Sequence, residues 1–331
     1  MNLRFSIIIP VYNRPQEIDE LLNSLLFQDY AKPFEIVIIE DGSTEKCKDI
    51  VKIYQEKLAI TYLFKDNSGP GQSRNYGMQK ASGNYFILLD SDVVLPKDYL
   101  SSIAKTLQSN FTEVFAAPDK SHHLFTEIQK AINYAMTSFL TTGGLRNNKG
   151  NTKFQLRSFN MGMSKKTFEL TSGFEKQNYG EDIDLSFRID KLGLSKQFIE
   201  KAFVYHKRRT NWLRFYKQTF NFGSARPILN KMHKNTAKWT YWFPSVFIIG
   251  LFLSIISLFI GYPILYILYT LYFLVIFMHA LFLTKNVKVA LFAVQATFIQ
   301  FLGYGFGFIK SQFKLHIFQK SKEETFPKMF S

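Results

Sequence analysis

Two carboxylates, Asp90 and Asp92, follow directly after a run of five large apolar residues at 85–89. An uninterrupted apolar run of this length predicts a strand that is buried on both faces. The carboxylates then lie at the C-terminal end of that strand, which is the edge where open α/β sheets bind ligands. Like charges this close repel each other, and a divalent ion that also holds a phosphorylated ligand would relieve the repulsion. Taken alone, the triplet at 90–92 is better explained as a solvated turn.

The elements that would position these carboxylates alternate between strand and helix. Apolar runs predict strands at 5–10, 35–39, 60–64 and 85–89, and helical periodicity predicts helices near 17–26, 45–58 and 73–80. This alternation predicts a doubly wound, mostly parallel α/β sheet. Since parallel strands end at one edge, polar residues that follow them should gather there, among them Glu40 and Asp41 after the second strand.

The pattern changes beyond Asp92. We expect a helix at 95–107, a strand at 114–117 and an amphipathic helix within 122–140. The glycine- and asparagine-rich segment 141–151 is of the kind that forms a mobile lid over a site. A second acidic group, Glu181 and Asp182, follows Gly180 and opens another predicted helix.

The composition narrows the class of protein. The 331 residues carry a net charge of +15, which suits nucleic acid, an anionic membrane surface or phosphorylated substrates. The charge concentrates in a basic, aromatic-rich stretch at 201–238 that leads into apolar sequence, and no nucleic-acid recognition motif accompanies it, so we expect no nucleic-acid partner. One cysteine, Cys47, excludes an internal disulfide. The apolar run that Pro10 closes is too short for a signal peptide, so we expect a cytoplasmic N-terminal part.

The last part of the chain predicts a membrane domain. Residues 243–283 contain no charged side chain, which is about twice the length of one membrane span, and Gly261 divides the run. A third apolar segment covers 288–309. Basic residues before, between and after these segments all favour the cytoplasmic side, whereas three full spans would place the tail outside. One segment is therefore re-entrant or lies in the interface, and the sequence leaves open which one it is.

Four motifs in this order resemble a known family. They are Pro10-Val11-Tyr12-Asn13, Glu40-Asp41-Gly42-Ser43, Asp90-Ser91-Asp92 and Gly180-Glu181-Asp182. Together they resemble the inverting family-2 glycosyltransferases of the GT-A fold, over roughly residues 4–226. The glycine-rich segment 303–308 is similar to the membrane-anchored, exopolysaccharide-type branch. The domains implied are a GT-A domain at 1–226, a basic juxtamembrane segment at 227–241, a membrane domain at 242–310 (segments 243–260, 264–283 and 288–309) and a basic tail at 311–331.

The resemblance implies a role for each motif residue. Pro10, Tyr12 and Glu40 would shape the nucleotide-base pocket, Asp41 would accept a hydrogen bond from the base or ribose, and Arg74 would contact the nucleotide. Asp90 would face the ribose or diphosphate, and Asp92 would ligate a metal with His206. Asp182 would be the general base, and Glu181 would orient the acceptor. Oxygen ligands suit Mg²⁺ or Mn²⁺, and an added imidazole favours Mn²⁺.

Each residue also has a structural explanation. Asp41 before a glycine is an ordinary turn residue, and Arg74 suits a helix surface. Glu181 and Asp182 would favour the dipole of the helix that they begin, and His206 lies in a basic run where solvated histidines are common.

The implied activity is transfer of a sugar from a nucleotide-sugar, expected to be a UDP-sugar, to a hydroxyl of a lipid-linked or cell-surface glycan. The enzyme would lie at a bacterial-type inner membrane, in contact with its lipids, with the catalytic domain in the cytoplasm. Three alternatives remain. A polyprenyl-phosphate sugar synthase would need no base, a processive synthase would carry a Gln-x-x-Arg-Trp element that is absent here, and a non-catalytic membrane scaffold would not need the carboxylates.

Overall fold

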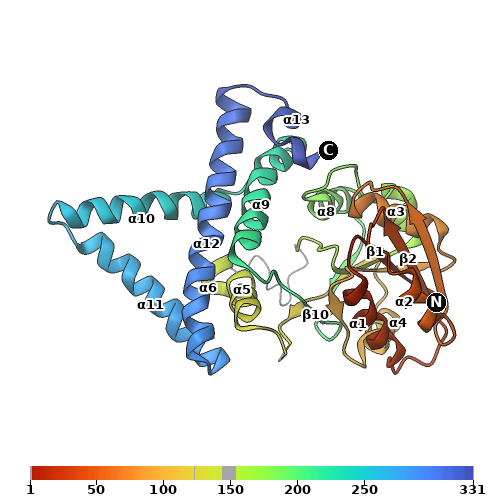
Figure 1. Ribbon diagram of the computed structural model, residues 1–331. Coiled ribbons are helices and arrows are strands. Elements are labelled where there is room, and N and C mark those ends of the chain that lie inside the picture. The colour runs from red at the N-terminus through yellow and green to blue at the C-terminus, as the bar shows by residue number, and fades with distance from the viewer. Residues whose placement is uncertain (1, 123, 144–153, 331) are drawn as a thin grey trace. The chain divides into compact units, whose positions relative to one another are not determined.

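A computed structural model describes residues 2–122, 124–143 and 154–330 (Figure 1). The chain forms two compact units. Unit 1 comprises Met1–His122 and Asn148–Lys207, and unit 2 comprises His123–Asn147 and Arg208–Ser331. Residues 144–151 of the predicted lid lie outside the described residues, and Thr141 and Thr142 end a short helix instead.

Unit 1 is built on a seven-stranded sheet with the order β3-β2-β1-β4-β8-β6-β9. Strands β3, β2, β1 and β4 are parallel, β8 is antiparallel to both of its neighbours, and β9 is parallel to β6. This mostly parallel arrangement confirms the predicted α/β class. The strands are β1 (Phe5–Val11), β2 (Glu35–Asp41), β3 (Ile60–Lys65), β4 (Tyr85–Leu89), β6 (Val114–Ala116), β8 (Asn160–Ser164) and β9 (Lys196–Phe198).

Helices cover both faces of this sheet, which is why β4 is apolar at every position and β1 at every position except Ser6. Alternate residues of β1 and β4 divide between two buried clusters, because successive side chains of a strand point to opposite faces. One cluster includes Ile7 and Ile87 with α1 (Pro15–Leu26), α2 (Lys48–Gln55) and α4 (Tyr99–Ser109). The other includes Ile8 and Leu88 with α3 (Pro70–Lys80) and α8 (Glu181–Lys191), and α7 (Lys165–Thr171) lies on this side. Each buried Ile or Leu contributes roughly 1.5–3 kcal/mol.

A small second sheet in unit 1 connects distant parts of the sequence. Its order is β5 (Val93–Val94), β10 (Val204–His206) and β7 (Asp119–Lys120). His206 pairs with Val93 in the antiparallel register, and the Lys207 amide donates to the Asp92 carbonyl over 2.9 Å. The pairing brings residue 206 beside residue 92.

Unit 2 is helical, and three of its described helices are long and apolar enough to cross a membrane: Trp239–Phe259, Ile264–Thr284 and Val287–Ile317. They include α10 (Phe243–Phe259), α11 (Ile264–Thr284) and α12 (Val287–Gln312), in blue tones in Figure 1. The other elements are α5 (Glu127–Thr137), α6 (Phe139–Thr142), α9 (Trp212–Met232), the turn η1 (Trp239–Trp242), the π-helical turn η2 (Phe313–Ile317), α13 (Lys322–Thr325) and η3 (Pro327–Met329).

Glycines bring the backbones of α9 and α12 into contact. A Cβ on Gly303 would lie 2.1 Å from Thr219 Oγ1, and one on Gly223 would lie 2.1 Å from the Tyr304 carbonyl oxygen. Small residues allow two helices to approach this closely. The N-terminal two thirds of α9 fall within the predicted domain 1–226, yet α9 packs on α12 in unit 2. The predicted domain limits follow composition and stay a prediction, whereas the two units follow packing.

Candidate active site

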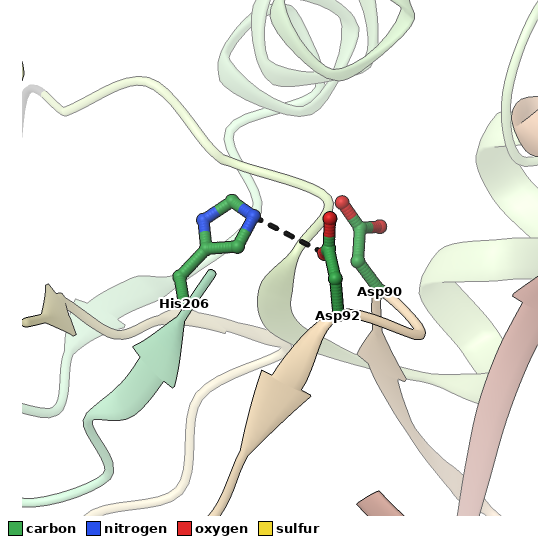
Figure 2. Close-up of side chains that lie close together, drawn as sticks. All are labelled: Asp90, Asp92 and His206. Carbon is green, nitrogen blue, oxygen red and sulfur yellow. Dashed lines mark ion pairs between the residues drawn. The ribbon is translucent and has the colours of Figure 1, made fainter. Parts of the chain in front are cut away.

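Asp90, Asp92 and His206 come together at the C-terminal end of β4 (Figure 2). Asp90 directly follows β4, Asp92 precedes β5, and His206 ends β10. One potential ligand atom from each residue lies within 4.8 Å of those from the other two. His206 Nε2 is 3.2 Å from Asp92 Oδ1, and the imidazole packs on Phe159, with ring centroids 4.7 Å apart. The structure therefore assembles the three residues that the sequence analysis associated with the diphosphate and metal.

A cation that sequence analysis did not single out also contacts Asp92. Arg14 Nη1 forms an ion pair with Asp92 Oδ2. Burial alone would raise the pKa of Asp92, but His206 and Arg14 hold that pKa well below its usual range. Arg14 directly follows the Pro10–Asn13 motif in the sequence, so the only signal for it was a basic residue next to that motif.

The residues of this cluster suit a divalent metal. Asp92 Oδ1 is buried, and apart from His206 Nε2 at 3.2 Å it has no polar partner among the described residues. Two carboxylates and an imidazole form a mixed oxygen and nitrogen ligand set, which fits Mn²⁺ better than an all-oxygen set would. We conclude that Asp90, Asp92 and His206 could hold such an ion.

Arg74 connects this cluster to the second acidic group. The Arg74 side chain is 2% exposed, and its Nη2 contacts Asp90 Oδ1 at 2.5 Å. Its Nη1 is 3.7 Å from Glu181 Oε1, and its guanidinium lies 5.4 Å from the centre of the Phe174 ring. The two acidic motifs are 91 positions apart, from Asp90 to Glu181, yet they share one buried cation.

Asn75, the next residue of α3, holds the loop that precedes α8. Its amide group donates to the Phe174 carbonyl at 2.7 Å and accepts from the Phe174 amide at 2.8 Å. Gly173 has φ +71°, and a Cβ there would lie 2.2 Å from Asn75 Oδ1, so only glycine fits. Arg188 of α8 donates to the Gly173 carbonyl at 2.7 Å from the other side. These bonds fix the beginning of α8 beside α3.

Glu181 and Asp182 occupy the first turn of α8 in different surroundings. Burial, with Asp182 beside it, raises the pKa of Glu181 to about 8, although Arg74 opposes this shift. This upward shift of the pKa favours the protonated form of Glu181, which is a weaker proton acceptor than a carboxylate. Asp182 accepts the Ile183 amide at 2.8 Å, and Asp182 Oδ2 lies 3.8 Å from Arg157 Nη1. The role of Asp182 as general base stays a prediction. Arg157 had no signal in the sequence.

Asp41 is buried at the end of β2 and bound by a single loop. Its Oδ1 accepts from Lys65 Nζ at 2.5 Å and from the Ser68 amide at 2.9 Å, and its Oδ2 accepts from the Gly69 amide at 3.0 Å. These bonds connect β2 to the segment that enters α3. They are enough to explain Asp41 structurally, and its contact with a base or ribose stays a prediction.

Glu40 is also satisfied from within the protein. It is fully buried and accepts from the Ser43 hydroxyl, from the Cys47 amide at 2.8 Å and from the Tyr62 hydroxyl at 3.1 Å. Pro10 is buried in β1, whereas Tyr12 is 52% exposed just after β1. The base-pocket role of these residues stays a prediction, and Tyr12 has the surface available for stacking.

Asn13 links the two loops that follow β1 and β2. It adopts a left-handed backbone with φ 51°, which asparagine tolerates better than most residues. Its Oδ1 accepts from the Thr44 amide at 2.8 Å and from the Glu45 amide at 2.9 Å. The motif at 10–13 therefore fixes the shape of this edge of the sheet.

The family model and the relatives that match this chain agree on one family. Residues 6–170 match the family described as glycosyl transferase family 2. The poly(ribitol-phosphate) beta-N-acetylglucosaminyltransferase TarS of Staphylococcus aureus is 36% identical over 115 residues, which are 34% of this chain and 20% of TarS. Validoxylamine A glucosyltransferase of Streptomyces hygroscopicus is 36% identical over 101 residues, or 30% of this chain and 24% of that protein. The matched stretch thus spans only about a fifth to a quarter of these relatives.

Solved structures share the fold across most of the chain. The mannosyltransferase PcManGT from Pyrobaculum calidifontis, in complex with GDP-Man and Mn²⁺, has a TM-score of 0.59 at 15% identity, covering 93% of this chain and 88% of that one. Residues 1–349 of S. aureus TarS with UDP-GlcNAc have a TM-score of 0.51 at 18% identity, covering 94% and 92%. At these identities the likeness shows the fold alone, and it is the GT-A fold that the motifs predicted.

Proposed function

Because this chain belongs to glycosyl transferase family 2, we propose that it transfers a sugar from a nucleotide-sugar to a hydroxyl group, with inversion at the anomeric carbon. The observation that carries this proposal is the position of Arg74, which contacts Asp90 on the donor side and Glu181 on the acceptor side. These contacts of one buried residue support the proposal that the candidate diphosphate-binding residues and the candidate base belong to one site.

The proton-accepting group in this proposal is Asp182. It takes the proton of the acceptor hydroxyl while the hydroxyl oxygen bonds to the anomeric carbon. The bond from that carbon to the diphosphate breaks, and its electron pair leaves with the nucleoside diphosphate. Glu181, protonated at neutral pH, donates a hydrogen bond to the acceptor and adds no negative charge beside Asp182.

The donor would bind along the C-terminal edge of the sheet. Tyr12 would form part of the base pocket, together with Pro10 and Glu40, and Asp41 would accept a hydrogen bond from the base or ribose, as the family resemblance implies. Asp90, Asp92 and His206 would hold Mn²⁺ or Mg²⁺, which supplies positive charge to offset the charge that develops on the leaving diphosphate. Complexes of the fold neighbours with GDP-Man and with UDP-GlcNAc support a nucleotide-sugar donor. We favour a UDP-sugar, as the sequence analysis did.

The acceptor is proposed to be a lipid-linked or cell-surface glycan. The apolar helices of unit 2 support this choice, since they would hold the enzyme at a membrane where such an acceptor resides. We propose the bacterial inner membrane, its lipids as partners, and unit 1 on the cytoplasmic side, in keeping with the many lysines that flank the apolar helices.

The test uses purified full-length protein and measures nucleoside diphosphate released from a panel of nucleotide-sugars. Asp182→Asn should lower transfer by roughly 10²–10⁴-fold, the usual contribution of a general base, and calorimetry should show unchanged donor binding. Asp190→Asn is the matched control, since Asp190 lies on the same helix and its side chain is 47% exposed. Full transfer by Asp182→Asn would remove Asp182 as the base. If a polyprenyl phosphate is the acceptor and the variant stays active, the synthase alternative is correct.

A further inference from the structure

The hairpin formed by α10 and α11 exposes apolar surface on every side beyond its base. Within the described stretch 249–275, Ser254 is the only buried residue. Side chains of Phe252, Ile256 and Phe259 are 54%, 57% and 84% exposed, and the hairpin has no charged residue. Exposure of a continuous apolar surface of this size to water is unfavourable, so another apolar phase must cover it. A lipid bilayer fits, because the lysines lie outside the hairpin, at its base and beyond.

α12 has the length and apolarity of a membrane span, but a charged helix accompanies it. Trp212 at the beginning of α9 packs on Phe292 of α12, with ring centroids 5.7 Å apart. Further along, a Cβ on Gly307 would lie 2.2 Å from the Phe220 carbonyl oxygen. The two helices therefore run side by side from about residue 292 to 307 of α12 (Figure 1). If α12 crossed the bilayer, α9 would have to cross beside it.

α9 is unsuited to hydrocarbon. It carries the exposed cations Arg214, Lys217 and Lys231, and each cation at a bilayer centre disfavours insertion by roughly a hundredfold. The beginning of α12 is also flanked by α5: Lys288 Nζ of α12 lies 3.7 Å from Glu127 Oε1 of α5. Polar helices thus accompany α12 over most of its length. Such a group of helices is stable at the membrane surface, with its apolar sides toward the lipid.

The start of α10 and the end of α11 both pack on α12. Phe247 near the start of α10 packs on Phe301 with ring centroids 4.8 Å apart, and the Ser245 hydroxyl donates to the Gly305 carbonyl at 3.1 Å. At the other arm, Ile276 and Ala280 join the buried cluster that contains the first turns of α12. The connecting turn is therefore the point of the hairpin farthest from α12 (Figure 1).

The turn of the hairpin has no charged residue that would hold it in water on the far side of the bilayer. The 17 residues of α10 rise about 26 Å and the 21 residues of α11 rise about 32 Å, so both arms fit within or close to the ~30 Å hydrocarbon core. The turn is Ile260-Gly261-Tyr262-Pro263, without a charge. Its amides are bonded internally: Gly261 donates to the Leu258 carbonyl at 3.2 Å, and Tyr262 donates to the Ser257 carbonyl at 2.8 Å. Such a Schellman turn suits a dry environment, where unpaired amides are costly.

We propose that the α10–α11 hairpin enters the bilayer from one side and ends inside it, while α12, α9 and α5 lie on the membrane surface. The lysines before α10, those between α11 and α12, and those of the tail then face the same side, as their shared preference for one leaflet requires. Unit 1 is on this side too, since the chain continues from it directly into α9. The proposal does not depend on the transfer activity.

Single cysteines test this topology in the full-length chain. In a Cys47→Ala background, Lys288→Cys and Lys320→Cys report the base of the hairpin and the tail, Lys52→Cys reports unit 1, and Tyr262→Cys reports the turn. A membrane-impermeant maleimide is applied to vesicles of both orientations. The first three should be labelled from the same side, and Tyr262→Cys from neither side until detergent is added. Labelling of Tyr262→Cys from the opposite side, or of Lys288→Cys and Lys320→Cys from different sides, would establish full spans and overturn the proposal.

A charge at the turn gives a second readout. Tyr262→Lys should lower retention on membranes by roughly a hundredfold, because the lysine must enter hydrocarbon, whereas the control Tyr262→Phe should be retained like the parent. Equal retention of both variants would mean that the turn lies in water. If the parent chain were soluble after cell lysis and eluted as a dimer, the hairpin would cover a second copy of the chain, and the bilayer would be the wrong partner.

Discussion

Replacing Glu181 with glutamine should remove a pH-dependent loss of stability. Glu181 is buried next to Asp182, and this raises its pKa from 4.5 to about 8 in the folded chain. Between these two pH values the folded state holds a proton that the unfolded state releases. The free energy of unfolding therefore falls as the pH rises from about 4.5 to about 8, and it is unaffected by this group below that window.

The size of the effect follows from the shift. A shift of one pKa unit corresponds to 1.36 kcal/mol, so the loss is at most about 5 kcal/mol. This is an upper value, because ionised Glu181 would attract Arg74, now 3.7 Å away, and regain part of the energy. Glutamine has the same size and stays neutral, so it matches protonated glutamate at pH 5 and avoids the loss at pH 9.

Thermal unfolding of the full-length protein in detergent at pH 5, 7 and 9 measures this change in stability. At 2–4 °C per kcal/mol for a unit of this size, Glu181→Gln should melt near the parent at pH 5 and roughly 10 °C above it at pH 9. Glu169→Gln is the control, because Glu169 is an exposed glutamate of α7. Parallel pH profiles for the parent and Glu181→Gln would refute the reasoning and would show that Glu181 is ionised at neutral pH.

Two further predictions concern the donor side. Asp92→Ala should weaken the binding of Mn²⁺, and of nucleotide in the presence of Mn²⁺, by at least about a hundredfold, because losing even an outer-shell partner of a metal ligand costs 10–100-fold in affinity. Calorimetry measures both affinities. Unchanged binding would support the solvated-turn explanation. Arg74→Met should lower the free energy of unfolding by about 3–5 kcal/mol, because two carboxylates lose the buried cation that they share, and this is read from denaturant unfolding. Arg74→Lys should recover part of the loss, and an Arg74→Met chain as stable as the parent would contradict the bridging role.

The sheet could be predicted because its signals are local. Strands buried on both faces are nearly continuous apolar runs, and 36–39 and 85–89 are such runs. The first acidic pair was placed correctly at the end of β4 for the same reason. Helix ends were less certain: the helix expected at 95–107 begins at Tyr99 instead.

The partners of the acidic residues were not predictable in this way. His206 reaches Asp92 only because β10 pairs with β5 over more than a hundred residues, and three-residue strands leave no periodic signal. Arg14 and Arg157 contact the carboxylates from loops, where a basic residue has no pattern that distinguishes it from a solvated one. The family resemblance found His206, and no principle of sequence patterning would have found Arg157.

The helices of the predicted membrane domain could likewise be predicted only in part. Composition located α10, α11 and α12, but it could not show that α9, with its four cations, packs lengthwise on α12. The glycines at 303 and 307 were visible as small residues, yet their partner lies some 80 positions earlier in the chain.

The bonds between Asn75 and Phe174 have a consequence for engineering. Exchanging the segment 172–182 between relatives is an obvious route to a new acceptor preference. In this chain the segment is held by Asn75, next to the arginine that contacts Asp90. A chimaera that replaces the segment but keeps the resident α3 would therefore misplace groups on both sides of the site, so the two pieces have to be transplanted as a pair.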